Sequence, residues 1–139
     1  MKPGFVVDCS IAMTWLFKDE ATPKTAELLS RLLTEVALLP AWWFLEVTNV
    51  LALAERKGRI TPAQSDTFIG DLGKLDFEID DQAPARSFVH LLPLCRTHML
   101  TSYDAMYLDL AVRRRLPLAT LDADLRKAAK KLGVTLLGQ

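Results

Sequence analysis

Short apolar runs alternate along the chain with longer amphipathic stretches. The apolar runs predict strands at residues 4–7, 36–39, 77–80, 116–120 and 134–137. The longer stretches predict helices at residues 10–17, 22–33, 42–57, 61–72, 84–96, 102–115 and 122–132. Such alternation is typical of a parallel sheet covered by helices. We therefore expect one domain over residues 1–139, of the α/β class, built as a three-layer α/β/α sandwich on a five-stranded parallel sheet.

The composition agrees with a folded domain in a reducing compartment. Of 139 residues, 50% are apolar and 24% are charged, which is enough to build a core. The 17 basic and 17 acidic residues cancel, which excludes a uniformly basic nucleic-acid binder but not a locally basic face. Cys9 and Cys95 form no zinc-type cluster, and the longest apolar run, residues 36–45, is too short to span a membrane. Asp8 interrupts any signal-peptide core, so we expect a cytoplasmic protein with no membrane partner.

Four acidic residues stand where core patterning would not place them: Asp8, Glu46, Asp104 and Asp122. Asp8 and Asp122 follow predicted strands, and the carboxyl edge of a parallel sheet is where such folds bind ligands. Glu46 lies on the apolar face of its predicted helix, where a basic side chain, a metal ion or nearby solvent would have to satisfy its charge. Asp104 begins a helix that packs into the interior. These positions could converge in one cleft.

Most of these acids also have an ordinary structural explanation. Asp8 could cap the helix that follows it, as aspartate often does. Asp104 follows Thr101 at the spacing of a capping-box variant. Either Asp122 or Asp124 could cap the helix after the fourth strand, but both cannot.

A cluster of four carboxylates would repel itself unless a cation joined it. Oxygen-only ligation is what Mg²⁺ or Mn²⁺ prefers, and such sites support phosphoryl chemistry. Ser10 and Thr120 lie two residues from Asp8 and Asp122, where they could orient carboxylates or hold water. Capping and strand filling explain these two hydroxyl residues equally well.

Four segments carry motifs: FVVDCS at residues 5–10, EVTNVL at 46–51, SYDAMYL at 102–108 and LATLD at 118–122. In order and spacing they resemble the PIN-domain proteins, and among these the VapC-type ribonuclease toxins of bacteria and archaea. The resemblance spans nearly the whole chain, and the YDAxYL block is its most specific element.

The resemblance implies an α/β/α fold and an endoribonuclease that depends on Mg²⁺ or Mn²⁺. By the same resemblance, the catalytic and metal-binding quartet is Asp8, Glu46, Asp104 and Asp122, with Asp8 and Asp104 as the main ligands. Asp124 would lie at the edge of the site, and Ser10 and Thr120 match small hydroxyl positions of the family. Metal-activated water would then attack an RNA phosphodiester.

The resemblance also implies partners. Toxins of this type are restrained by a small antitoxin protein, whose tail wraps the helices of the toxin and often delivers a basic side chain into the acidic site. The family commonly dimerises, so a homodimer is a further expectation.

Other classes explain the sequence less well. A haloacid-dehalogenase phosphatase needs a second acid two residues after Asp8, where Ser10 stands. A response-regulator receiver could use Asp80 or Asp81 after the third strand, but no acidic pair flanks Asp8. A catalytically silent protein-binding module is the main alternative. Four aromatic residues support it, although core packing also explains them: Trp15, Trp42, Trp43 and Phe44.

The zero net charge hides two oppositely charged segments. Residues 66–81 contain six acids and one lysine, whereas residues 113–131 contain seven basic residues and two acids. The basic segment predicts contacts to the RNA backbone, with a solvated helix face as the alternative. The candidate contacts are Arg113, Arg114, Arg115, Arg126 and Lys127.

Overall fold

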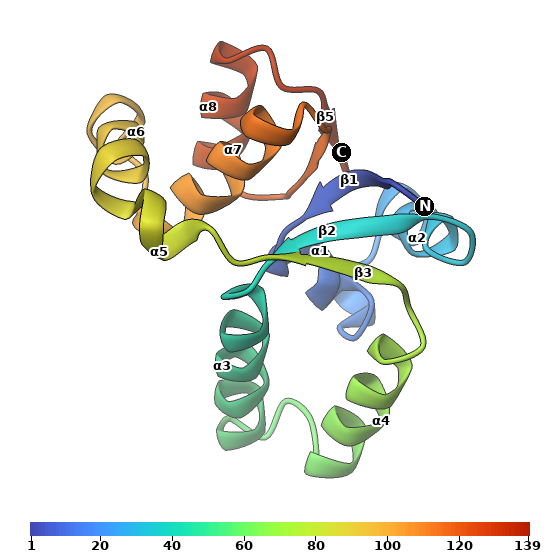
Figure 1. Ribbon diagram of the computed structural model, residues 1–139. Coiled ribbons are helices and arrows are strands. Elements are labelled where there is room, and N and C mark those ends of the chain that lie inside the picture. The colour runs from blue at the N-terminus through green and yellow to red at the C-terminus, as the bar shows by residue number, and fades with distance from the viewer.

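The computed structural model describes residues 1–139 and contains a sheet of five strands in the order β3-β2-β1-β4-β5 (Figure 1). The strands are β1 Pro3–Val7, β2 Val36–Pro40, β3 Phe77–Asp80, β4 Leu118–Ala119 and β5 Leu136–Leu137. Every neighbouring pair is parallel. The predicted five-stranded parallel sheet is confirmed, although β4 and β5 are shorter than the apolar runs from which they were predicted.

Helices cover both faces of this sheet. They are α1 Cys9–Thr14, α2 Pro23–Arg31, α3 Trp43–Arg56, α4 Pro62–Leu72, α5 Ala83–Arg86, α6 Leu92–His98, α7 Ser102–Arg114 and α8 Ala123–Lys131, with short turns η1 Lys18–Glu20 and η2 Ser87–Leu91. The helix α1 contacts α2 and α3, whereas α7 packs directly on β1, β2 and β4. The first four helices lie on one side of the sheet and the last four on the other (Figure 1). This confirms the three-layer α/β/α sandwich.

Local sequence explains where two of the helices begin. Thr22 and Thr61 each cap a helix through a reciprocal capping box, and a proline occupies the first turn in both cases. Proline fits there because the first turn needs no backbone donor from it.

The helix predicted over residues 84–96 is present as an unbroken helical stretch over residues 83–98, but it is not α-helical throughout. It divides into α5, a π-helical turn at η2 and α6, with Pro93 in the first turn of α6. Proline has no N–H, and its ring would clash with the carbonyl one turn earlier, so a wider turn precedes it. This helical stretch forms an arm that projects from the body of the domain (Figure 1). Phe88 and Val89 on the arm are exposed.

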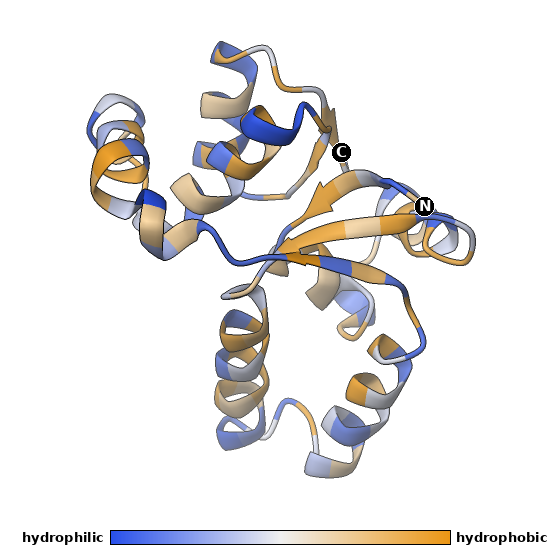
Figure 2. Cartoon of the chain, in the orientation of Figure 1, coloured by the Kyte–Doolittle hydropathy of each residue, from blue (hydrophilic) through white to orange (hydrophobic).

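The core follows the sheet and the inner helix faces. A cluster of 32 buried apolar residues joins the layers, and the apolar colouring concentrates on the strands (Figure 2). No helix is long and apolar enough to cross a bilayer.

The strand order positions the candidate site. The chain builds β1, β2 and β3 in one direction and then returns to add β4 and β5 on the other side of β1. The topological switch point therefore lies between β1 and β4. Asp8 and Thr120 directly follow these two strands, and ligands of open parallel sheets bind outside the carboxyl ends at such a point.

Candidate active site

Asp8 directly follows β1 and is buried, with 4% of its surface exposed. Its Oδ1 accepts hydrogen bonds from Ser10 Oγ at 2.6 Å and from the backbone N of Ile11 at 3.1 Å. Its Oδ2 accepts one from Thr120 Oγ1. Asp8 is therefore the N-cap of α1 and also a buried acid at the switch point, so the capping role does not exclude a chemical one.

The two hydroxyls on Asp8 join the loops across the switch point. Ser10 Oγ accepts a hydrogen bond from the backbone N of Leu121 at 3.0 Å, and Thr120 Oγ1 accepts one from the backbone N of Asp122 at 3.0 Å. Each hydroxyl thus donates to Asp8 and accepts from the loop after β4. This arrangement fixes the orientation of the Asp8 carboxylate without supplying a positive charge.

Glu46 lies in the first turn of α3, half-buried, and its Oε1 accepts a hydrogen bond from the Tyr107 hydroxyl at 2.6 Å. Burial raises the pKa of Glu46, the bond from Tyr107 lowers it in part, and the charge of Asp104 raises it further. Sequence reasoning did not assign Tyr107 a role. The available signal was a buried tyrosine, whose hydroxyl needs a partner.

Asp104 lies in the first turn of α7, where its backbone N donates to Thr101 Oγ1 at 3.3 Å. Burial raises the pKa of the Asp104 carboxyl to about 6, with further contributions from Asp122 and Asp8. Asp122 caps α8, and its Oδ1 accepts a hydrogen bond from the backbone N of Leu125 at 2.8 Å.

The four carboxylates act on one another electrostatically. Burial raises the pKa of Asp8 to about 6 against the hydrogen bonds from its three donors, and Glu46 adds to the rise. The charges of Asp122, Asp8 and, more weakly, Asp124 at the edge of the cluster raise the pKa of Asp104 further. None of the eight ion pairs in the molecule involves any of these acids. The structure therefore gathers negative charge at the switch point and supplies no basic side chain to balance it.

This donor set suits a hard divalent cation, because every candidate ligand is a carboxylate oxygen. The acids are not drawn together into a closed metal-binding group of three or more side chains. Hydrogen bonds from protein donors hold both oxygens of Asp8 and one oxygen of Asp122, and the like charges of the acids repel one another, which keeps the carboxylates apart. Because every candidate ligand is a carboxylate oxygen, the residues still fit Mg²⁺ or Mn²⁺ in their donor chemistry.

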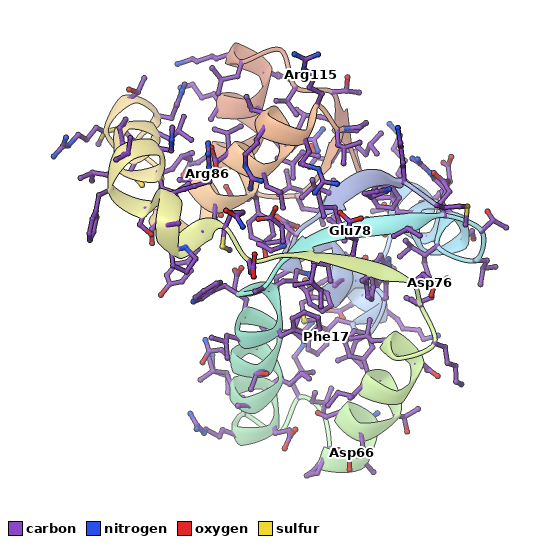
Figure 3. All side chains as sticks on the ribbon, in the orientation of Figure 1. Phe17, Asp66, Asp76, Glu78, Arg86 and Arg115 are labelled. Carbon is purple, nitrogen blue, oxygen red and sulfur yellow. The ribbon has the colours of Figure 1, made fainter.

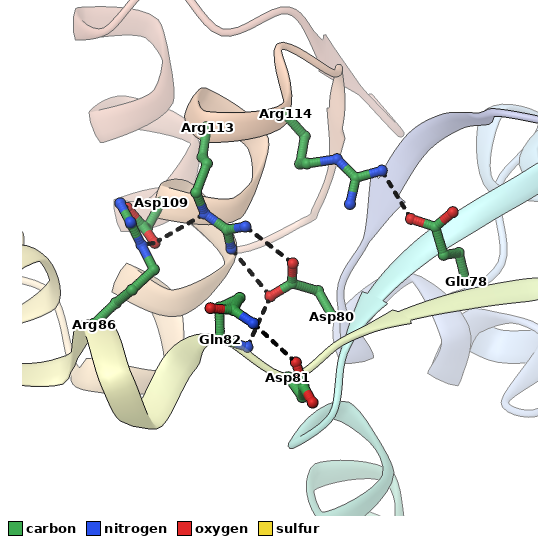
Figure 4. A network of polar contacts seen from close by, with 8 residues as sticks. All are labelled: Glu78, Asp80, Asp81, Gln82, Arg86, Asp109, Arg113 and Arg114. Carbon is green, nitrogen blue, oxygen red and sulfur yellow. Dashed lines mark hydrogen bonds and ion pairs between the residues drawn. The ribbon is translucent and has the colours of Figure 1, made fainter.

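Two of the five predicted RNA-contacting residues pair with the acidic segment. Arg113 binds Asp80 at 2.9 Å and Arg114 binds Glu78 at 2.7 Å (Figure 4). Asp80, which the receiver hypothesis would need as a phosphate acceptor, is held by an arginine. The oppositely charged segments of the sequence are therefore partly each other's partners.

The other three basic residues differ in their surroundings. Arg126 donates to the backbone oxygens of Thr120 and Leu137 at 2.6 and 3.0 Å, which joins the ends of β4 and β5. Arg115 and Lys127 are exposed and form no ion pair. Arg115 lies on the α7 side of the sheet, far from Asp66 on α4 (Figure 3).

Fold and site together define a class: a parallel α/β domain with unpaired carboxylates at its switch point. The chain belongs to the PIN-domain family, whose model matches residues 5–131. The PIN domain is generally a nuclease fold, and its nucleases generally use divalent metal ions.

The fold also matches solved structures. The crystal structure of PAE2754 from Pyrobaculum aerophilum is similar at a TM-score of 0.71 and 20% sequence identity, covering 98% of this chain and 92% of that chain. At this identity the likeness establishes the fold alone. No curated protein sequence matches the chain.

Proposed function

We propose that the chain is an endoribonuclease that depends on Mg²⁺ or Mn²⁺, in which Asp8, Glu46, Asp104 and Asp122 hold the cation. The carboxylate cluster without a basic partner at the switch point carries this proposal. A divalent ion bound there would polarise a phosphate oxygen and lower the pKa of an attacking water.

Hydrogen bonds within the chain would orient two of the four carboxylates for the cation. Asp8 is held by three donors and Glu46 by the Tyr107 hydroxyl, so both carboxylates have one defined orientation. Thr120 and Ser10 hold Asp8 in this orientation without a cation. Thr101 is the one side-chain hydrogen-bonding partner that acts on the pKa of the Asp104 carboxyl, so Asp104 has fewer partners than Asp8.

An apolar groove supports the further proposal of a toxin restrained by a small antitoxin protein. The groove encloses about 450 Å³ between α3, α4 and β3. Its lining includes Trp43, Phe44, Leu51, Ile69, Phe77 and Ile79. Such a groove suits the apolar face of a partner helix. The same groove is the observation that favours the second candidate function, a catalytically silent binding module.

Substitution of Asp8 tests the nuclease proposal. We expect Asp8→Asn to reduce metal-dependent RNA cleavage more than about 100-fold, because loss of a ligand costs more than loss of a residue that orients one. The protein should stay folded by circular dichroism. Asp71→Asn, at an exposed position on α4, is the matched control and should cleave normally.

Calorimetry with Mn²⁺ separates the two candidate functions. The wild type should bind the ion and Asp8→Asn should bind it more weakly. Undiminished metal-dependent cleavage by purified Asp8→Asn would refute the assignment of the site, and a wild type that binds no Mn²⁺ would favour the silent module.

A further inference from the structure

A second hollow adjoins the acidic cluster and shares one of its residues. It encloses about 470 Å³, and its lining includes Cys9, Trp42, Glu46, Asn49 and Tyr103. These residues come from the start of α1, the first turns of α3 with its N-cap, and the first turn of α7. A ligand in this hollow would therefore touch Glu46 and lie beside the carboxylates.

Two aromatic side chains form one wall of the hollow. Trp42 and Tyr103 also line a neighbouring depression of about 290 Å³ in front of α5, so they stand as a ridge between the two spaces. Tyr103 is 56% exposed, and neither its hydroxyl nor the Trp42 indole N–H makes a hydrogen bond within the protein. By contrast, Trp15 donates to the Thr25 carbonyl and Trp43 is buried in the core. Core packing thus accounts for Trp43 and for part of Trp42, but it does not account for Tyr103.

The polar groups of the hollow can form hydrogen bonds with the edge of a flat heterocycle. Asn49 is exposed on α3, one turn beyond Glu46 and on the same helix face. Its amide has no intramolecular partner and offers one acceptor and two donors.

We propose that Trp42, Tyr103 and Asn49 form a nucleobase subsite. The base next to the phosphate being cut stacks against the two aromatic side chains while Asn49 bonds to its edge. This inference rests on the proposed nuclease function and adds the form of the substrate. A base can enter the hollow only when it is unpaired, because a paired base is enclosed in its helix.

Two properties favour a base over a protein side chain as the occupant. Stacking on aromatic faces beside a polar amide is how proteins commonly hold single-stranded bases. The hollow is also continuous with the carboxylates through Glu46, so a base in it places its own phosphate at the site. The apolar groove of α3 and α4 has a different lining and no acidic residue.

Fluorescence of 2-aminopurine tests the subsite independently of cleavage. A short single-stranded RNA carries this base at one position at a time and binds the full chain in Ca²⁺. We expect quenching at one position. Tyr103→Ala should abolish the quenching and weaken binding about 5- to 100-fold, the effect of losing one stacked base. Tyr103→Phe should keep both, because it retains the ring.

Two controls isolate the base from the rest of the strand. An RNA that is abasic at the quenched position should bind wild type and Tyr103→Ala equally. Phe88→Ala removes an exposed aromatic from the arm, away from the hollow, and should change nothing. RNA binding that is equal in wild type and Tyr103→Ala, with no quenched position, would overturn the subsite and leave the nuclease proposal standing. A wild type that binds no RNA at all would overturn both.

Discussion

The molecule treats its carboxylates in two different ways at the same edge of the sheet. In the first group, Asp8 is bound only by neutral donors, and its pKa is raised to about 6. In the second group, Asp109 receives two hydrogen bonds from Arg86 at 2.7 and 2.8 Å, and Asp80 receives two from Arg113 at 2.9 and 3.0 Å (Figure 4). Burial raises the pKa of Asp80, but hydrogen bonds from Arg113 and the Gln82 backbone more than offset it, and the net pKa is lowered.

The difference shows how a fold separates structural acids from chemical ones. Hydroxyl and backbone donors orient a carboxylate but leave its charge in place, so a cation from solution can still be bound. An arginine satisfies both the geometry and the charge, which makes the acid part of the framework. The paired group joins the arm to the body of the domain, because Arg86 lies on α5, Asp109 and Arg113 on α7, and Asp80 on β3.

The strongest test of the contrast removes the acid at the centre of the paired group. Asp109→Ala leaves Arg86 without a partner in a partly buried place, and Arg113 keeps only Asp80. We expect a loss of about 2–3 kcal/mol in the free energy of unfolding, because an uncompensated charge remains. Denaturant unfolding measures the loss, and Asp66→Ala on the exposed face of α4 is the control. A change no larger than that of the control would show that the network is not structural.

In the unpaired group, removing the charge of an acid is expected to raise the stability of the fold, and the size of this effect depends on pH. The pKa of Asp104 is about 6 in the folded chain and near the ordinary aspartate value when unfolded. The folded state therefore holds the proton more tightly, and ionisation lowers stability as the pH rises through about 4 to 6. Without metal, Asp104→Asn should exceed the wild type in Tm by a few degrees above pH 6, and the two should converge toward pH 4.

Thermal unfolding in EDTA between pH 4 and 8 measures this crossover. Added Mn²⁺ should then reverse the order at pH 7, because only the wild type retains the full ligand set. A difference between the two proteins that does not vary with pH would contradict a raised pKa at Asp104.

The smallest effect is expected at the exposed pair of Arg114 and Glu78. Their side chains are 34% and 43% exposed, so solvent screens the attraction. A double-mutant cycle with Arg114→Ala and Glu78→Ala should give a coupling below about 0.5 kcal/mol, and it should vanish in 1 M salt. A coupling as large as that between Arg113 and Asp80 would show that exposure does not distinguish the two pairs.

Most of the fold could be predicted because it depends on local patterns. Alternating apolar and amphipathic stretches announced all five strands, and threonine-proline pairs announced two helix starts. The helix over residues 84–96 was predicted from its periodicity, but its π-helical turn at residues 87–91 was not, because Pro93 changes the hydrogen bonding without changing that periodicity. The pattern records which side chains are apolar, and it does not record which backbone groups are paired.

The candidate site was predictable only in part. Acids after strands converge because parallel strands end at one edge, so Asp8 and Asp122 could be expected there. The bond from Tyr107 to Glu46 joins residues 61 positions apart, and no local pattern shows it. The same limit explains why Arg113 and Arg114 were predicted to contact RNA. No local pattern shows that the packing of α7 pairs them with acids of β3.

The hydrogen bond from the Thr120 hydroxyl to Asp8 has a consequence for the protein during its synthesis on the ribosome. These residues lie 112 positions apart, and contacts of such separation form late because a long loop must close first. During synthesis, β1 and α1 leave the ribosome long before β4 exists. An incomplete chain therefore carries the Asp8 carboxylate without the partner that holds it in place. The site can therefore be completed only once synthesis has passed Thr120 and Asp122.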